Sequence, residues 1–221
     1  YLDSLQKLVN ADTQRIHSTF NQMIASTGRL SSTSPNFQNI PIRTDEGREI
    51  RKSFVAQKEN WKIFSADYSQ VELRMMAHFS NDRGLIDAFK NSIDVHSKTA
   101  SLVYNVPIEL VQPEMRRTAK VVNFGIMYGA GAFRIGQELG IPRNEASSLI
   151  ESYFQQYPGI QNYIDSTCSM AREKKYVETI LGRRRPIWDA DSDNGLRRQA
   201  AERMAINMPI QGSSAEMIKI A

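Results

Sequence analysis

The sequence feature that most constrains this chain is a stripe of four side chains spaced four residues apart. Arg116, Lys120, Phe124 and Tyr128 occur within RRTAKVVNFGIMYG. Because an α-helix advances about 100° per residue, each of these side chains lies only ~40° round from the last, along ~18 Å of helix. The stripe is cationic in its first half and aromatic in its second. A nucleoside triphosphate has the same polarity, since it is anionic at one end and flat and stackable at the other.

Two glycines beside this stripe favour the nucleotide interpretation. Gly125 and Gly129 each cost ~1 kcal/mol in a helix interior. A helix tolerates that cost most readily where another group approaches its backbone closely or where the helix ends. The alternative is a solvated helix face beside a core face, and on these residues alone both interpretations stay open.

The composition sets broad bounds on the class of protein. The 221 residues suffice for a core and for one or two lobes, and 41% hydrophobic and 24% charged residues are ordinary for a soluble globular protein. The net charge of +4 weakly favours a polyanionic partner. Cys168 is the only cysteine, so no intrachain disulfide can form and we expect a reducing compartment, the cytoplasm. The chain contains no run of eighteen apolar residues, so we expect no membrane span.

A carboxylate follows a short apolar run in the segment FSADYSQVELR. The run over 62–66 predicts a strand that leads into Asp67, with a helix from about residue 70. The tip of a strand is a common place for a Mg²⁺ ligand, although Asp also caps helices there. Ser69 and Glu72 fit the S-x-x-E capping box, and the spacing alone favours Glu72 as a cap over a ligand contact. Phosphoryl transfer generally needs a second carboxylate, and the candidates are Asp82, Asp87, Asp94, Asp189, Asp191, Asp193 and Glu216.

A second polar stripe follows near the end of the chain. Arg203, Asn207 and Gln211 are again four residues apart, and they can donate to phosphates or to base edges in the degenerate minor groove. By itself this stripe is better explained as a solvated helix face. The same alternative, together with Asx-turn chemistry, applies to an early polar loop. Its candidates are Arg29, Asn36, Gln38 and Asn39.

The remaining patterns predict an α+β chain with helices dominating its middle. Periodicity and punctuation predict helices over 2–9, from about 70, over 95–104, after Pro113, over 145–153, over 160–174 and from 196, the last interrupted at Met208-Pro209. Strands are expected over 15–23, 62–66 and 176–181, and loops over 27–43 and 189–195.

Five segments together resemble the ordered motifs of family A DNA polymerases, the bacterial DNA polymerase I type. They are TGRLSSTSPNFQNIPIR at 27–43, DYSQVELR at 67–74, DVHSKTA at 94–100, RRTAKVVNFGIMYG at 116–129 and AERMAINMPIQGSSAE at 201–216. The resemblance implies an α+β right-hand polymerase fold that is truncated before the last palm strands. It implies palm over 1–77, helical fingers over 78–188 and a return to the palm over 189–221.

The resemblance also implies roles for individual residues. Catalytic roles fall to Asp67, Arg116 and Lys120, with Asp67 and the Tyr68 carbonyl as ligands of Mg²⁺. Nucleotide contacts fall to Tyr68, Gln70, Glu72, His96, Arg116, Lys120, Phe124 and Tyr128. Contacts to primer–template DNA fall to Arg29, Gln38, Asn39, Arg203, Asn207 and Gln211.

The activity implied is that of a monomeric DNA-templated DNA polymerase, which transfers a nucleotide from a dNTP to a primer 3′-OH with two Mg²⁺ ions. Glu72 is then the steric gate that crowds a ribose 2′-OH. One alternative is a single-subunit RNA polymerase, against which Glu72 argues because that enzyme must admit the 2′-OH. The other is a noncatalytic nucleic-acid-binding fragment.

Two departures from the family pattern concern the carboxylates. The His-Asp-Glu of the family's motif C occurs nowhere in the sequence, and Glu216 stands where the family usually has Asp. The chain begins at Tyr1 and stops inside an apparent helix. We therefore expect a piece of a longer polypeptide that is inactive on its own.

Overall fold

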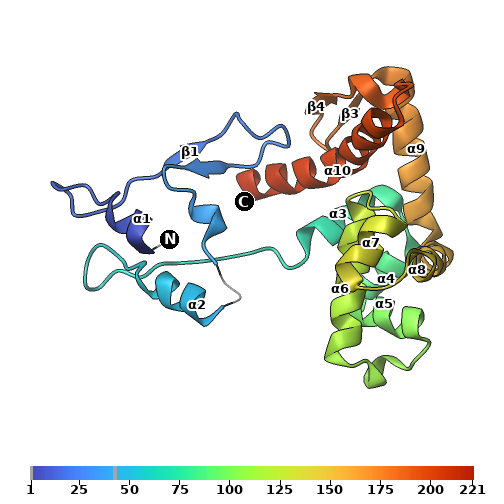
Figure 1. Cartoon of the computed structure of the whole chain (residues 1–221), viewed down its shortest axis with the longest axis horizontal. Helices are drawn as coiled ribbons and strands as arrows, with labels where there is room; N and C mark the ends of the chain where they lie inside the picture. Colours follow the sequence, from blue (N-terminus) through green and yellow to red (C-terminus); the bar gives the residue numbers. More distant parts are fainter. Residues whose placement is uncertain (1, 42–43) are drawn as a thin grey trace. The chain divides into compact units, whose positions relative to one another are not determined.

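The computed structural model describes residues 2–41 and 44–221. These residues form two compact units, Tyr1–Ser69 and Gln70–Ala221, and each is described here by itself (Figure 1). None of the helices within the described ranges is long and apolar enough to cross a membrane.

The first unit holds a small hairpin and short helices. Strand β1 (Thr19–Asn21) pairs antiparallel with β2 (Ser31–Thr33), with Phe20 opposite Ser32. The strand predicted over 15–23 therefore forms only in its centre, and the loop predicted over 27–43 contains a strand and a helical turn, while residues 42–43 lie outside the described ranges. The helical elements are α1 (Leu2–Gln6), η1 (Phe37–Asn39) and α2 (Asp45–Lys52).

The strand predicted over 62–66 is wrong. The segment has no regular structure in the described chain, and Trp61, Ile63 and Phe64 are exposed. Apolar residues favour a strand only when a neighbouring strand satisfies the backbone ladder, and no segment of the described residues pairs with this one. Asp67 therefore stands in an irregular exposed segment and not at the tip of a strand.

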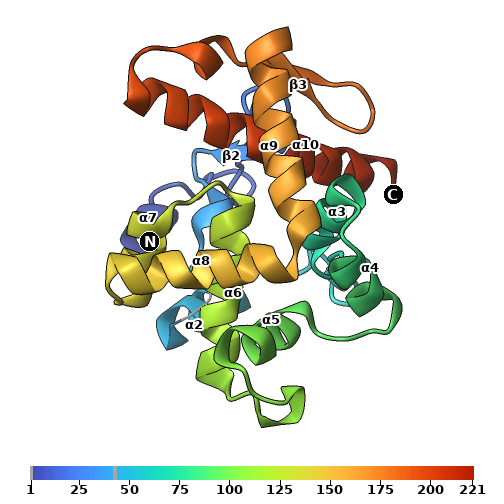
Figure 2. The ribbon, with the colours of Figure 1, turned by 90° about the vertical axis from the view of Figure 1, so that its right-hand side faces the viewer.

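The second unit is mainly helical, and α9 crosses α10 in it (Figure 2). Its main core joins α3, α6 and α7 through buried side chains such as Leu73, Val122 and Ile135. The helices are α3 (Val71–Ser80), α4 (Arg83–Lys90), α5 (Val95–Tyr104), η2 (Ile108–Leu110), α6 (Pro113–Met127), α7 (Ala132–Leu139), α8 (Arg143–Gln156), α9 (Pro158–Lys174), η3 (Trp188–Asp191) and α10 (Gly195–Ile220). The one small sheet pairs β3 (Tyr176–Glu178) antiparallel with β4 (Arg184–Pro186). Helices with small sheets agree with the predicted α+β class.

Helix α6 carries the basic–aromatic stripe, as predicted. Pro113 occupies its first turn, where a missing N–H costs nothing. A Cβ on Gly125 would come within 3.2 Å of Ile135 Cγ1, so this glycine lets α7 pack closely. Gly129 follows the C-cap residue Tyr128 with a φ of +69°, a left-handed conformation that suits glycine. Both predicted reasons for the glycines, close approach and helix end, are therefore confirmed.

Helix α10 contradicts the interruption predicted at Met208-Pro209. It runs from Gly195 to Ile220 with Pro209 inside it. A proline removes one backbone hydrogen bond and crowds the preceding turn. Here Met208, Pro209 and Ile210 are all buried, and α10 packs against α3, α9 and β3. The packing of this stretch offsets the local cost, which a sequence pattern alone does not reveal.

Candidate functional site

The first half of the stripe on α6 faces the start of α5. Asp94 is the N-cap of α5, where its Oδ1 accepts the backbone N–H of Ser97 at 2.7 Å. Arg116 donates to the same carboxylate twice, from Nε to Oδ1 and from Nη2 to Oδ2, each at 2.9 Å. This bidentate pair holds the guanidinium on the α5 side of α6. Asp94 is one of the candidates for a second metal carboxylate, and in the structure it is the partner of Arg116.

Each member of this ion pair stabilises the charged form of the other. Burial alone would raise the pKa of Asp94, but hydrogen bonds from Arg116 and Ser97 hold that pKa well below its usual range. The hydrogen bond to Asp94 raises the pKa of Arg116 in turn. The side chains of Arg116 and Asp94 are 44% and 33% exposed, so the pair is open to exchange with a competing anion.

His96 lies beside this pair on the first turn of α5 and is only 3% exposed. Its Nδ1 lies 3.0 Å from the side-chain Nδ2 of Asn123 on α6. Burial lowers the pKa of His96 to about 4; Asp94 opposes the shift, and Arg116 and Lys120 add to it. The imidazole is therefore neutral near neutral pH.

The aromatic half of the stripe continues from these cations. The ring of Phe124 lies 5.6 Å from that of His96 and 6.0 Å from that of Tyr128, measured between centroids. Lys120 Nζ lies 6.0 Å from the Phe124 ring centroid. Cationic and aromatic groups thus follow one another without a break along α6, as the sequence predicts.

Two further predicted nucleotide contacts join the stripe from the start of α3. The hydroxyl of Tyr128 donates to Glu72 Oε2, and Glu72 is buried. Gln70 Nε2 donates to Asp94 Oδ2 at 3.4 Å. The predicted capping box is wrong, because the N-cap of α3 is Gln70, in a left-handed conformation with φ of 54°, and not Ser69. The carboxylate of Glu72 is thus directed to the aromatic end of the stripe.

The second polar stripe lies on α10. Arg203 is exposed, whereas Asn207 and Gln211 are half-buried. Asn207 Oδ1 is buried without a hydrogen-bond partner among the described residues, an arrangement that favours a bound donor. A Cβ on Gly129 would lie 2.9 Å from Arg203 Cγ, so the start of this stripe lies against the end of α6.

A cavity of about 630 Å³ opens next to Arg203, between α7, α9 and α10. Phe133, Arg143 and Arg172 line it together with Gly129. Sequence reasoning missed Phe133 and Arg143.

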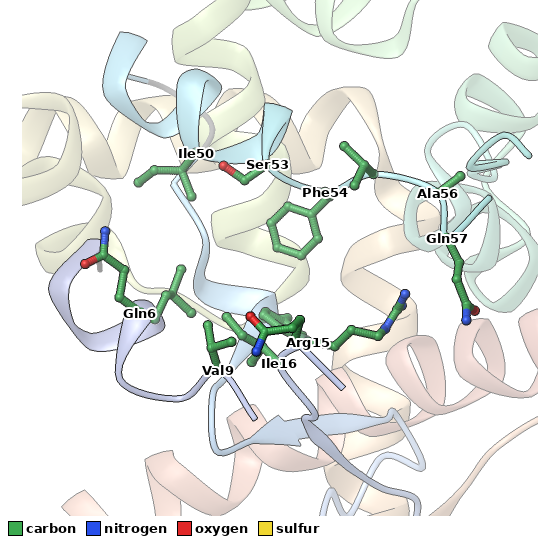
Figure 3. Close-up of a pocket in the computed structure, with 13 residues that line it drawn as sticks. Gln6, Val9, Arg15, Ile16, Ile50, Ser53, Phe54, Ala56 and Gln57 are labelled. Carbon is green, nitrogen blue, oxygen red and sulfur yellow. The ribbon is translucent and has the colours of Figure 1, made fainter. Parts of the chain in front are cut away.

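The five other residues to which the family resemblance assigns a role belong to the first unit. All of them are exposed, including Asp67 and Tyr68. Gln38 donates from Nε2 to the carbonyl of Leu30 at 2.8 Å, which orders the loop around it. The remaining two are Arg29 and Asn39. A separate apolar pocket of about 590 Å³ in this unit contains none of the five (Figure 3).

The predicted metal ligands, Asp67 and Tyr68, do not belong to a cluster of possible metal ligands among the described residues. The described residues contain no group of three or more His, Cys, Asp or Glu side chains that suits a metal ion. Several candidates for the second carboxylate have other partners. Asp82 caps α4, Asp191 pairs with Lys175, and Glu216 accepts from Thr179 and Arg183.

Comparison with known proteins gives consistent matches. The whole chain, residues 1–221, matches the family model of DNA polymerase family A. DNA polymerase I of Bacillus caldotenax is 50% identical over 100% of this chain and 25% of the relative. The thermostable DNA polymerase I of Thermus aquaticus is 48% identical over 100% of this chain and 26% of its own length. The chain thus spans about a quarter of these relatives.

A solved structure also resembles this chain closely. It is the POL domain of Pol1 from M. smegmatis in complex with DNA primer-template and dNTP. The match has a TM-score of 0.94 and 49% sequence identity, and it covers 99% of this chain and 38% of that chain.

Proposed function

The chain belongs to DNA polymerase family A, and from this premise we propose that the whole protein is a DNA-templated DNA polymerase that transfers a nucleotide from a dNTP to a primer 3′-OH. The observation that supports this most strongly is the joined face of α5 and α6. There Arg116, Lys120 and neutral His96 lead directly into Phe124 and Tyr128.

These residues would act mainly by positioning and neutralising charge, which is what phosphoryl transfer requires. Arg116 and Lys120 would bind the triphosphate oxygens. Arg116 would exchange Asp94 for phosphate, a second acceptor of the same bidentate geometry. Lys120 would also be placed to give a proton to the leaving pyrophosphate. Phe124 would pack on the sugar and base, and Tyr128 would stack at the templating position.

The proposed metal is Mg²⁺, held by the Asp67 carboxylate and the Tyr68 carbonyl. Mg²⁺ prefers oxygen ligands and is commonly bound by one or two carboxylates together with substrate phosphates. The exposed carboxylate of Asp67 fits one such position. When bound, Mg²⁺ supplies activation of the primer hydroxyl and neutralisation of the leaving group.

The remaining predicted roles complete the proposal. Glu72, directed to the stripe by Tyr128, would exclude a ribose 2′-OH, and Gln70 would lie near the incoming nucleotide. Palm over 1–77 and 189–221 and fingers over 78–188 remain proposed boundaries. The proposed contacts to primer–template DNA are Arg29, Gln38, Asn39, Arg203, Asn207 and Gln211.

Primer extension by the whole protein tests this function. We expect Mg²⁺-dependent incorporation of dNTPs that Asp67→Asn abolishes and Asp87→Asn, an equal change of charge on the exposed face of α4, leaves intact. Salt-dependent duplex binding without turnover would instead establish the noncatalytic interpretation. Preferential incorporation of ribonucleotides would establish the RNA polymerase interpretation.

A further inference from the structure

A buried network of four polar side chains runs from the core of the second unit to the joined face of α5 and α6. The Tyr157 hydroxyl lies 3.3 Å from Thr99 Oγ1, which donates to Asn123 Oδ1 at 3.1 Å. Asn123 Nδ2 lies 3.0 Å from His96 Nδ1. All four side chains are at most 3% exposed. Water therefore contributes little to satisfying their polar groups, and their hydrogen bonds must be made within the protein.

In the structure the Asn123 amide has Oδ1 toward Thr99 and Nδ2 toward His96, and this orientation fixes the direction of each hydrogen bond. The amide nitrogen of Asn123 is only a donor, so Nδ1 of His96 must be the acceptor. A neutral imidazole carries a single N–H, which is then on Nε2. Since the one hydroxyl hydrogen of Thr99 goes to Asn123, the hydroxyl of Tyr157 donates to Thr99. Each donor in this network thus faces an acceptor.

The other ring nitrogen of His96 is left for a ligand. No hydrogen bond to Nε2 occurs within residues 2–41 and 44–221. The charged groups that face the ring are Asp94, Arg116 and Lys120, and the ring of Phe124 lies 5.6 Å away. An Nε2–H at this place adds a donor beside two cations, whereas an Nε2 lone pair would repel an anion bound to them.

We propose that Asn123 is a positioning residue that fixes His96 as the Nε2–H tautomer, so that the start of α5 offers a neutral hydrogen-bond donor to a polyphosphate oxygen. Thr99 and Tyr157 hold the amide of Asn123 in the orientation that this requires. The assignment of the ligand rests on the function proposed above, but the tautomer itself does not.

The low pKa of His96, about 4, agrees with this arrangement. A neutral donor keeps its single hydrogen across the physiological range, and it attracts phosphate without adding a third positive charge next to Arg116 and Lys120. A network that only tied α5 to α6 would serve equally well with either tautomer. The tautomer is therefore the property that separates positioning from simple packing.

Nitrogen-15 NMR of selectively labelled histidine measures this tautomer in the nucleotide-free chain. Replacing His17 and His78, both exposed, by Gln leaves His96 as the single signal. We expect the Nε2–H form in this background and in Thr99→Ser, which keeps the hydroxyl. In Asn123→Asp, a carboxylate can only accept, so the Nδ1–H form should appear. An Nδ1–H signal in the unaltered network, or no change in Asn123→Asp, overturns the inference.

A second variant guards against misfolding of Asn123→Asp. Thr99→Val keeps the shape but removes the donor to Asn123 Oδ1, so the amide can turn over. We expect a mixture of tautomers in this variant. A pure Nε2–H signal in well-folded Thr99→Val would show that Thr99 has no part in the assignment.

Binding of inorganic tripolyphosphate then tests the donor. Near pH 8, the loss of one hydrogen bond should weaken Asn123→Asp relative to wild type by about fivefold to tenfold. The ratio should shrink near pH 6, because the new carboxylate raises the pKa of His96 and imidazolium donates from both nitrogens. Equal affinities near pH 8 overturn the inference. Failure of the wild type to bind tripolyphosphate contradicts the proposed function instead, and leaves the tautomer result standing.

Discussion

Acidification should weaken the second unit through His96, and replacement of that side chain should remove the effect. His96 is 3% exposed and burial lowers its pKa from 6.5 to about 4. The unfolded chain therefore binds this proton at a higher pH than the folded chain does. The stability from neutral His96 is fully present above about pH 6.5 and is lost as the pH falls toward about 4.

The size of this effect follows from the two pKa values. Each pKa unit corresponds to about 1.4 kcal/mol, so the fall from 6.5 to about 4 gives a loss of about 3 kcal/mol over the whole window. This is a large fraction of the ~5–15 kcal/mol by which folded domains are typically stable. Most of the loss should be complete above the pH at which ordinary carboxylates take up protons.

Urea unfolding at several pH values measures the effect. Trp188 is the only tryptophan of the second unit, and Trp61→Phe removes the one in the first unit, so that tryptophan fluorescence then reports on the second unit alone. His96→Gln should flatten the free energy of unfolding between about pH 7 and pH 4.5. His78→Gln, which alters an exposed histidine of α3, should not. Equal pH dependence in wild type and His96→Gln would refute the reasoning.

Three further substitutions have expected outcomes. Asp94→Asn frees the guanidinium on α6 from its ion pair, so tripolyphosphate affinity in a binding titration should rise several-fold, by about 1 kcal/mol; Asp87→Asn is the charge-matched control, and an equal rise there contradicts the role of the pair. Gly129 has a φ of +69°, and a Cβ added to it would lie 2.9 Å from Arg203 Cγ. Urea unfolding of Gly129→Ala should therefore show a loss of ~1–2 kcal/mol in the free energy of unfolding. Gly131→Ala, where an added Cβ would meet open space, should be near neutral. Glu72→Ala should raise ribonucleotide incorporation in primer extension by at least about tenfold; unchanged selectivity removes Glu72 from the gate.

The sequence predicted the stripe on α6 well because helical spacing and glycine punctuation are local signals. Arg116, Phe124 and Tyr128 lie on one face, and Gly129 ends the helix, as the pattern indicates. The capping box at Ser69 failed because Gln70 starts α3 in a left-handed conformation. Local patterns are therefore reliable for long helices and weak for their first residues.

Other features depend on contacts between distant segments and leave no local trace. In the sequence Asn123 is one polar residue among others, and its hydrogen bond to His96 becomes visible only when α5 packs against α6. The segment over 62–66 has strand composition, but a strand also needs a neighbour. Pro209 remains helical because its surroundings are buried. In each case tertiary packing overrides the local preference.

The central claim is that the face formed by α5 and α6 binds the polyphosphate of a nucleotide. A calorimetric titration that compares a dNTP, tripolyphosphate and the corresponding deoxynucleoside tests it most directly. We expect the first two to bind and the nucleoside to bind far more weakly, and Lys120→Gln to weaken both phosphate ligands about tenfold. Equal binding of the nucleoside and the dNTP, or an unchanged affinity in Lys120→Gln, would contradict the claim.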